Sequence, residues 1–210
     1  MSAEARREAK RFKSLVEALF NEGIKYMQTK EGAAYGSINA NWFASRDELV
    51  SSMRPDTGNF GNKLVPLAPP KDLGPKAIVA MWCKWTFDAD YACEIQVMIH
   101  REKNQAYGFR IDKPNPRGDL RHGYWHVQFT REFQGGGAFT KATGIDWIST
   151  STPAFPIALD KDGGLLPKDA AIYATISLYG GTYPQDLSDT LKSMTGSESL
   201  KSIVLGTTAA

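Results

Sequence analysis

The sequence predicts an α+β fold: an antiparallel β-meander of about four strands with N-terminal and C-terminal helices packed on one face. Apolar side chains recur with helical spacing near the N-terminus, four strand-like segments fill the middle, and two helix patterns follow. Because the helices are segregated from the strands, a parallel doubly wound sheet is disfavoured. The 210 residues, 42% hydrophobic and 23% charged, are expected to form a single domain, 1–210.

A basic amphipathic helix is predicted over residues 1–30. Its apolar positions repeat at i, i+3 and i+4 and are Phe12, Leu15, Val16, Leu19, Phe20, Ile24 and Met27. Its first turns hold five cations, Arg6, Arg7, Lys10, Arg11 and Lys13. Cations there lie at the positive end of the helix dipole, which is slightly unfavourable unless they face an anion or a partner. The pattern fits a surface helix packed by its apolar stripe, and also a docking helix that protrudes beyond the core.

Two contrasting segments follow this helix. Ser45 and Glu48 have capping-box spacing, which predicts a short helix over 46–53 that ends before Pro55. Residues 54–76 carry five prolines and three glycines among scattered aliphatic residues, more than a strand or helix tolerates. We therefore expect a long irregular segment there, of the kind that is often functional or partner-binding.

The predicted meander occupies residues 77–131. Its strands are expected at 78–87, 92–100, 106–112 and 124–131, because apolar or alternating runs there are separated by turn residues. This order of short strands without intervening helices is typical of an antiparallel sheet.

Two helices are predicted within residues 165–195. The first covers 167–179, because Pro167 suits the first helical position and Gly180 suits the position after the last. The second lies near 184–194. Residues 147–157, which precede these helices, are expected to be extended.

Side-chain parity predicts the strand register. Three successive strands are apolar at the odd-numbered positions Ile95, Val97, Ile99, Tyr107, Phe109, Ile111, Trp125, Val127 and Phe129. If one face is buried, these strands pair odd with odd, and the polar even positions share the other face. A turn near residue 103 or 104 then puts Gln96 opposite Arg110. The next pair is Glu94 with Asp112, and His126 neighbours Arg110 or Asp112.

A histidine beside an aspartate and an arginine has the groups needed for acid–base cleavage of a phosphodiester. In this hypothesis His126 is the general base or acid, Arg110 stabilises developing charge and Asp112 orients the imidazole. His122, on the adjoining loop, is a second proton donor. The same residue types are usual on solvated strands, so the pattern also fits a solvated or structurally paired face, or a binding surface.

Charge is segregated along a chain whose formal net charge is only +2. Residues 1–13 hold five basic and two acidic side chains, and residues 100–122 hold six basic and three acidic ones. A phosphate-binding surface requires such segregation, although a solvated helix and loop also show it. The candidate binding residues are Arg6, Arg7, Lys10, Arg11, Lys13, Lys113, Arg117, Arg121 and Tyr124. Tyr124 is the aromatic of this region that shares the even face, where it could stack on a base.

Stronger signatures do not occur in the sequence. It has no phosphate loop, dinucleotide fingerprint, zinc-protease helix or serine-hydrolase elbow. Three histidines and two cysteines without C-x-x-C spacing give no zinc pattern, so we expect no metal and no cofactor. Cys83 and Cys93 flank a turn and can form a disulfide only if the register aligns them; reduced core cysteines are the alternative.

The N-terminal region is charged and lacks the apolar segment of a secretory signal. Apolar stretches are far shorter than the ~18–20 residues that cross a bilayer. We therefore expect a cytoplasmic protein with no membrane partner.

The leading hypothesis is a cytosolic, non-enzymatic binding module or complex subunit that docks through the N-terminal helix, the 54–76 segment and the basic 113–122 loop. A protein partner is expected, and RNA or DNA phosphates are the other candidate partner. The alternatives are a small metal-independent ribonuclease and a purely structural subunit of a protein assembly. The oligomeric state stays open.

Overall fold

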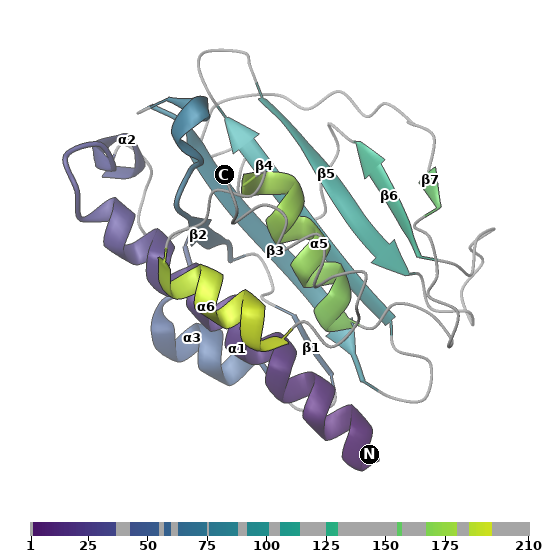
Figure 1. Ribbon diagram of the computed structural model, residues 1–210. Coiled ribbons are helices and arrows are strands. Elements are labelled where there is room, and N and C mark those ends of the chain that lie inside the picture. The colour runs from purple at the N-terminus through teal and green to yellow at the C-terminus, as the bar shows by residue number, and fades with distance from the viewer. Residues whose placement is uncertain are drawn as a thin grey trace.

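The computed structural model describes residues 2–36, 43–54, 57–59, 63–74, 76–87, 92–100, 106–113, 125–129, 155–156, 167–179 and 185–194. The helices are α1 (Ala3–Met27), α2 (Ala33–Gly36), α3 (Arg46–Ser52), α5 (Pro167–Tyr179) and α6 (Gln185–Met194). The strands are β1 (Thr57–Asn59), β2 (Val65–Leu67), β3 (Ile78–Thr86), β4 (Ala92–His100), β5 (Ala106–Lys113), β6 (His126–Phe129) and β7 (Phe155–Pro156). Figure 1 shows their arrangement.

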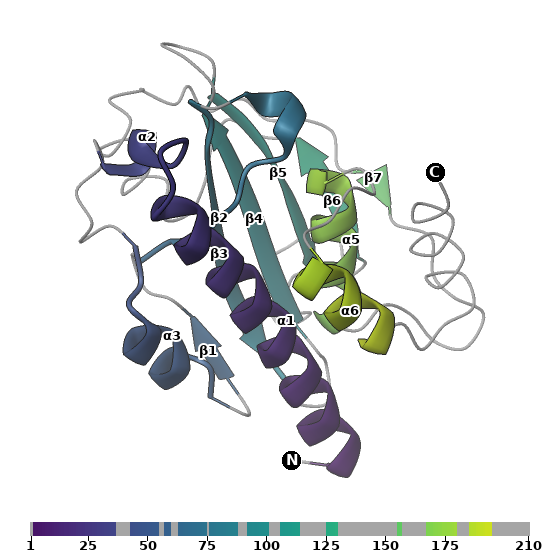
Figure 2. The same cartoon turned by 60° about the vertical axis from the view of Figure 1, so that its left-hand side comes forward.

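The strands form one antiparallel sheet in the order β1-β3-β4-β5-β6-β7, with β2 also paired to β3. The helices α1, α5 and α6 lie on the same face of this sheet (Figures 1 and 2). On that face the Phe12 ring of α1 packs 5.3 Å from Trp85 and 5.8 Å from Phe87, measured between ring centroids. The predicted α+β class, with helices from both parts of the chain on one face, is confirmed.

Helix α1 begins at a polar cap and is held along its length by an apolar stripe. The Ser2 side chain accepts a hydrogen bond from the Ala5 backbone N–H at 3.1 Å, which satisfies one of the free amides at the helix start. Ala5 and Ala9 are buried, like the larger apolar residues that follow. The helix is therefore packed from its first turns, as the apolar-stripe interpretation expects.

A backbone contact fixes α1 against β2. Gly23 is buried in α1, and a Cβ atom added there would lie 2.1 Å from the carbonyl oxygen of Pro66. Only glycine allows this approach without displacement of one backbone.

The predicted helices over 46–53, 167–179 and 184–194 are present as α3, α5 and α6. Ser45 and Glu48 form the expected capping box. The Ser45 hydroxyl accepts a hydrogen bond from the Glu48 backbone N–H, and the Glu48 carboxylate accepts one from the Ser45 backbone N–H. Hydrogen bonding to Ser45 lowers the pKa of the Glu48 carboxyl.

The expectation of an irregular 54–76 segment is wrong in part. It contains β1, β2 and a 3₁₀ helix over Lys71–Leu73. The two short strands pair with different ends of the same edge of β3, and Pro66 of β2 lies opposite Ala80. Proline is tolerated because β2 is an edge strand, where one side of the backbone needs no ladder hydrogen bond.

The odd-with-odd register predicted for three successive strands is confirmed in β4, β5 and β6. Val97 lies opposite Met81 on one side and Phe109 on the other. The same register places Cys83 opposite Ile95, and Cys93 opposite Trp85. The two cysteines are therefore not directly paired; both are free and buried, and burial raises the pKa of each thiol.

Two buried tyrosine hydroxyls form hydrogen bonds with the backbone at the end of β2. The Tyr35 hydroxyl accepts from the Val79 N–H at 2.8 Å and donates to the Leu67 carbonyl at 2.6 Å. The Tyr179 hydroxyl of α5 donates to the Ala68 carbonyl at 2.7 Å. Helix α2 is thus tied to the last residue of β2, and α5 to the residue that follows it.

Removal of the Tyr35 hydroxyl should destabilise the protein. Tyr35→Phe leaves the buried Val79 N–H and Leu67 carbonyl without this partner, and we expect a loss of about 1–3 kcal/mol in the free energy of unfolding. Urea denaturation followed by tryptophan fluorescence measures it. Tyr26→Phe is the control, because its exposed hydroxyl donates to the Glu31 carbonyl at 3.3 Å and not to the buried strand backbone described above. Equal losses in both variants would contradict the stabilising role of the Tyr35 hydroxyl.

Candidate functional site

Polar side chains of β4, β5 and β6 meet on the even face of the sheet. This sheet cluster consists of Glu94, Gln96, Arg110, Asp112, His126 and Gln128. The register pairs Gln96 with Arg110 and Glu94 with Asp112, as predicted. Asp112 is also the register partner of His126, so the predicted neighbour of the imidazole is the aspartate.

One carboxylate oxygen holds the centre of the sheet cluster. Asp112 Oδ1 lies 3.0 Å from His126 Nε2 and accepts a hydrogen bond from Arg110 Nε at 3.2 Å. Arg110 also donates through Nη2 to Gln128 Oε1 at 2.6 Å. Its Nη1 lies 4.0 Å from Glu94 Oε1. The guanidinium thus links two carboxylates and an amide from three strands.

The sheet cluster is largely buried. His126 is 3% exposed and Gln96 is fully buried, whereas the Arg110 side chain retains 26% exposure. Gln96 Nε2 donates to Glu94, and burial raises the pKa of the Glu94 carboxyl although Gln96 and Arg110 partly oppose the shift. In this part of the even face the charges are paired with one another rather than solvated.

The sheet cluster has part of the geometry that acid–base catalysis requires. Asp112 is positioned to orient the His126 imidazole, and Arg110 is beside it. A substrate must also reach the imidazole, and the 3% exposure of His126 gives little surface for that contact. The described arrangement therefore matches an internal ion-pair network more closely than an open catalytic site.

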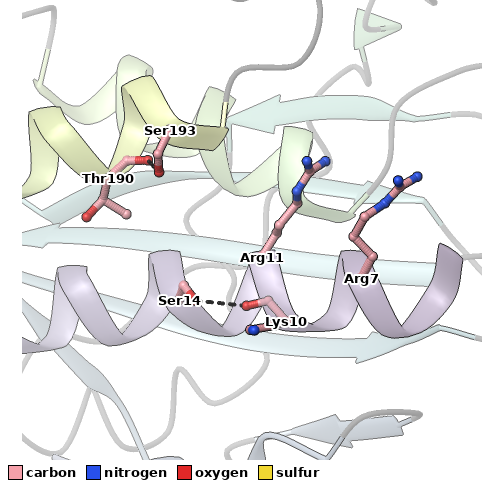
Figure 3. Close-up of a pocket in the computed structure, with 6 residues that line it drawn as sticks. All are labelled: Arg7, Lys10, Arg11, Ser14, Thr190 and Ser193. Carbon is pink, nitrogen blue, oxygen red and sulfur yellow. Dashed lines mark hydrogen bonds between the residues drawn. The ribbon is translucent and has the colours of Figure 1, made fainter. Parts of the chain in front are cut away.

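A second polar site lies between α1 and α6. It is an open groove of about 430 Å³, lined by Arg7, Lys10, Arg11, Ser14, Thr190 and Ser193. Figure 3 shows the four α1 residues along one side of the groove and the two hydroxyl residues of α6 along the other. We call it the basic groove.

The cations of the basic groove are spaced by the helix. Arg7 and Arg11 stand one turn apart on α1, about 6 Å along the axis. Arg7 and Lys10 are exposed, and Arg11 Nη1 lies 3.4 Å from Glu8 Oε1. Two guanidinium groups and an ammonium beside hydroxyls are groups that bind phosphate oxygens.

The other predicted binding residues are placed differently. Arg6 is exposed on α1 outside the groove lining, and Lys13 Nζ lies 3.8 Å from Glu17 Oε1. The backbone of Lys113 ends β5, but its side chain lies outside the described residues. The residues Arg117, Arg121, His122 and Tyr124 lie outside them as well.

Sequence reasoning missed the hydroxyl side of the groove. Thr190 and Ser193 face α1 because α6 packs beside it, and no local spacing encodes which helix becomes a neighbour. It also missed Glu8, which is buried in α1 next to Lys168 of α5. The signal available was a carboxylate on the otherwise apolar stripe of the first helix.

Comparisons with protein-family models, with curated proteins and with solved structures find no match to this chain. Within the part of the chain that the structure describes, no helix is long and apolar enough to cross a membrane. Among the same residues, no group of three or more histidine, cysteine, aspartate or glutamate side chains is arranged to hold a metal ion.

Asp112 should contribute more to the free energy of unfolding than any other member of the sheet cluster. Asp112→Ala leaves Arg110 and the buried His126 without their shared carboxylate, and we expect a loss of about 2–4 kcal/mol in the free energy of unfolding. Chemical denaturation measures it. Asp72→Ala, in the exposed 3₁₀ helix, should change that free energy by about 0.5 kcal/mol or less. A loss as small as the control's would show that the network is not stabilising.

Proposed function

We propose that the protein is a non-enzymatic binding module that contacts the phosphate groups of RNA or DNA through the basic groove. The observation that supports this most directly is the convergence of Arg7, Lys10 and Arg11 of α1 with the hydroxyls of α6 on one open groove. It agrees with the leading hypothesis from the sequence, in which the first helix is one of three docking elements beside the 54–76 segment and the 113–122 loop.

The environment of the groove favours a chain of phosphates as its ligand. The cations stand near the positive end of the α1 dipole, and an anion beside them would relieve that unfavourable arrangement. Their spacing along the helix axis presents successive positive charges rather than a single enclosed pocket. A flexible single strand can follow such a row through its backbone, without base readout.

Salt dependence provides the test. Three phosphate contacts on a single strand predict a slope of about −2 for log K against log salt, at about 0.7 per contact. Arg7→Gln/Lys10→Gln should weaken binding of a short hydroxyl-ended oligothymidylate and reduce the slope to about −0.7. Titration calorimetry at several salt concentrations measures both. Arg11 is kept because Glu8 is its partner.

The matched control removes two cations at the C-terminal end of α1, one in its last turn and one just after it. Lys25→Gln/Lys30→Gln lowers the net charge equally, and both lysines are outside the groove lining. We expect its salt slope to stay near that of the unmodified protein. Equal slopes in the two double variants would assign binding to net charge and contradict the groove. Absence of binding by the unmodified protein would favour the purely structural subunit.

The metal-independent ribonuclease is the second candidate function, and the 3.0 Å approach of Asp112 to His126 favours it. In that candidate His126 is the acid or base, Arg110 stabilises charge, Asp112 orients the imidazole and His122 supplies a second proton. The low exposure of His126 counts against it.

One assay separates the two candidate functions. For a non-enzymatic module, we expect EDTA-treated protein and its His126→Ala variant to show the same background cleavage of RNA. Cleavage that resists EDTA, follows a bell-shaped pH profile and disappears in His126→Ala would establish the ribonuclease instead. Gel analysis of a labelled RNA measures it.

A further inference from the structure

A buried carboxylate lies beneath the basic groove. The Glu8 side chain is 2% exposed, and its Oε1 lies 3.4 Å from Nη1 of Arg11, a residue of the groove lining. Its other oxygen, Oε2, lies 3.9 Å from Lys168 Nζ on α5 and has no hydrogen-bond partner. An ionised carboxylate in this position is incompletely satisfied.

The charged groups around Glu8 come from the helices packed against it. Arg7 and Arg11 belong to its own helix, and Lys168 and Asp169 belong to α5. The charged side chains described on α6, Asp189 and Lys192, are both exposed.

We infer that Glu8 sets the affinity of the basic groove, and that a phosphate chain bound there is taken up together with a proton at Glu8. The inference rests on the proposed phosphate binding.

The physical reason is competition for Arg11. While Glu8 is ionised, its charge offsets that of Arg11 and holds the guanidinium toward the protein. Protonation removes this offset and leaves Arg11 available to an external anion. By linkage, bound phosphates add negative charge near Glu8 and favour its neutral form by the same factor.

The direction of the pH dependence follows from the environment. Burial raises the pKa of Glu8 above its ordinary value, with Lys168 and Arg11 partly opposing the shift. Proton uptake therefore begins at a higher pH than for an exposed glutamate, and affinity increases as the pH falls through that range.

The protein can accommodate a neutral Glu8. Lys168 is almost fully buried, and its Nζ lies 2.6 Å from Asp169 Oδ1, much closer than to Glu8. When Glu8 is protonated, Lys168 keeps this carboxylate as its partner, so no buried ammonium is left alone.

Calorimetry on the full chain tests the inference. The probe is the hydroxyl-ended oligothymidylate, whose phosphodiesters and bases do not titrate between about pH 5 and pH 8. Affinity is measured across this range at constant ionic strength for the unmodified protein, for Glu8→Gln and for Glu17→Gln. Glu17 is the matched control: it lies on the same helix, is paired with Lys13 and is not part of the groove lining.

We expect the unmodified protein and Glu17→Gln to bind at least about threefold more tightly at low pH than at high pH. A coupling of one full pKa unit between binding and protonation would give about tenfold, and we expect a weaker coupling than that. Glu8→Gln should bind at high pH with the low-pH affinity and lose most of the pH dependence. If its affinity and pH dependence match those of the unmodified protein, Glu8 is only structural and the inference is overturned, while the proposed function stands. Absence of binding by the unmodified protein at every pH overturns the proposed function, and this inference with it.

A measurement without mutation covers the case in which Glu8→Gln does not fold. Titrations in buffers of different ionisation enthalpy report the protons taken up on binding. We expect more uptake at the lower end of this pH range than at the higher end, because burial raises the pKa of Glu8 above its ordinary value. Binding without proton uptake at either end of the range would overturn the inference.

Discussion

Side-chain alternation along β3, β4 and β5 constrains the rest of the structure, because the central parts of these strands are buried on both faces. A shift of one residue in pairing would move every side chain to the opposite face. The sheet cluster around Asp112 would then face α5, whose described buried side chains are mostly apolar. Ile95 and Val97 would exchange places with it. The observed register gives apolar groups to the helix layer and keeps paired charges together on the other face.

The helix layer has its own division between apolar and charged contacts. Phe12 and its neighbours pack on the tryptophan and phenylalanine side chains of β3. One turn earlier, Glu8 and Lys168 bring charge into the same helix contact, close to the surface groove. The apolar contacts of Phe12 and the charged contacts of Glu8 both belong to α1. The same helix therefore packs on the core and carries the charges of the groove.

Much of the fold could be predicted because local chemistry determines it. Alternation defined the register that pairs Asp112 with Glu94, the Ser45 capping box defined α3, and Pro167 marked the start of α5. The strands β1 and β2 could not be predicted, since each has only three residues and is held by β3, and β2 also by the distant Tyr35. The basic groove was half predictable: its cations lie within five residues of one helix, whereas the hydroxyls of Thr190 and Ser193 reach it only because α6 packs alongside.

The contact of Gly23 with the Pro66 carbonyl has a consequence for the length of α1. This contact fixes the rotational phase of the helix at one point. Arg11 lies twelve residues earlier, and each residue turns an α-helix by about 100°. An insertion or deletion of one residue between them would swing Arg7, Lys10 and Arg11 away from α6, even if every side chain were retained. The number of residues between the glycine and the arginine is therefore constrained in its own right, in addition to the identity of the apolar residues that pack α1 on the core.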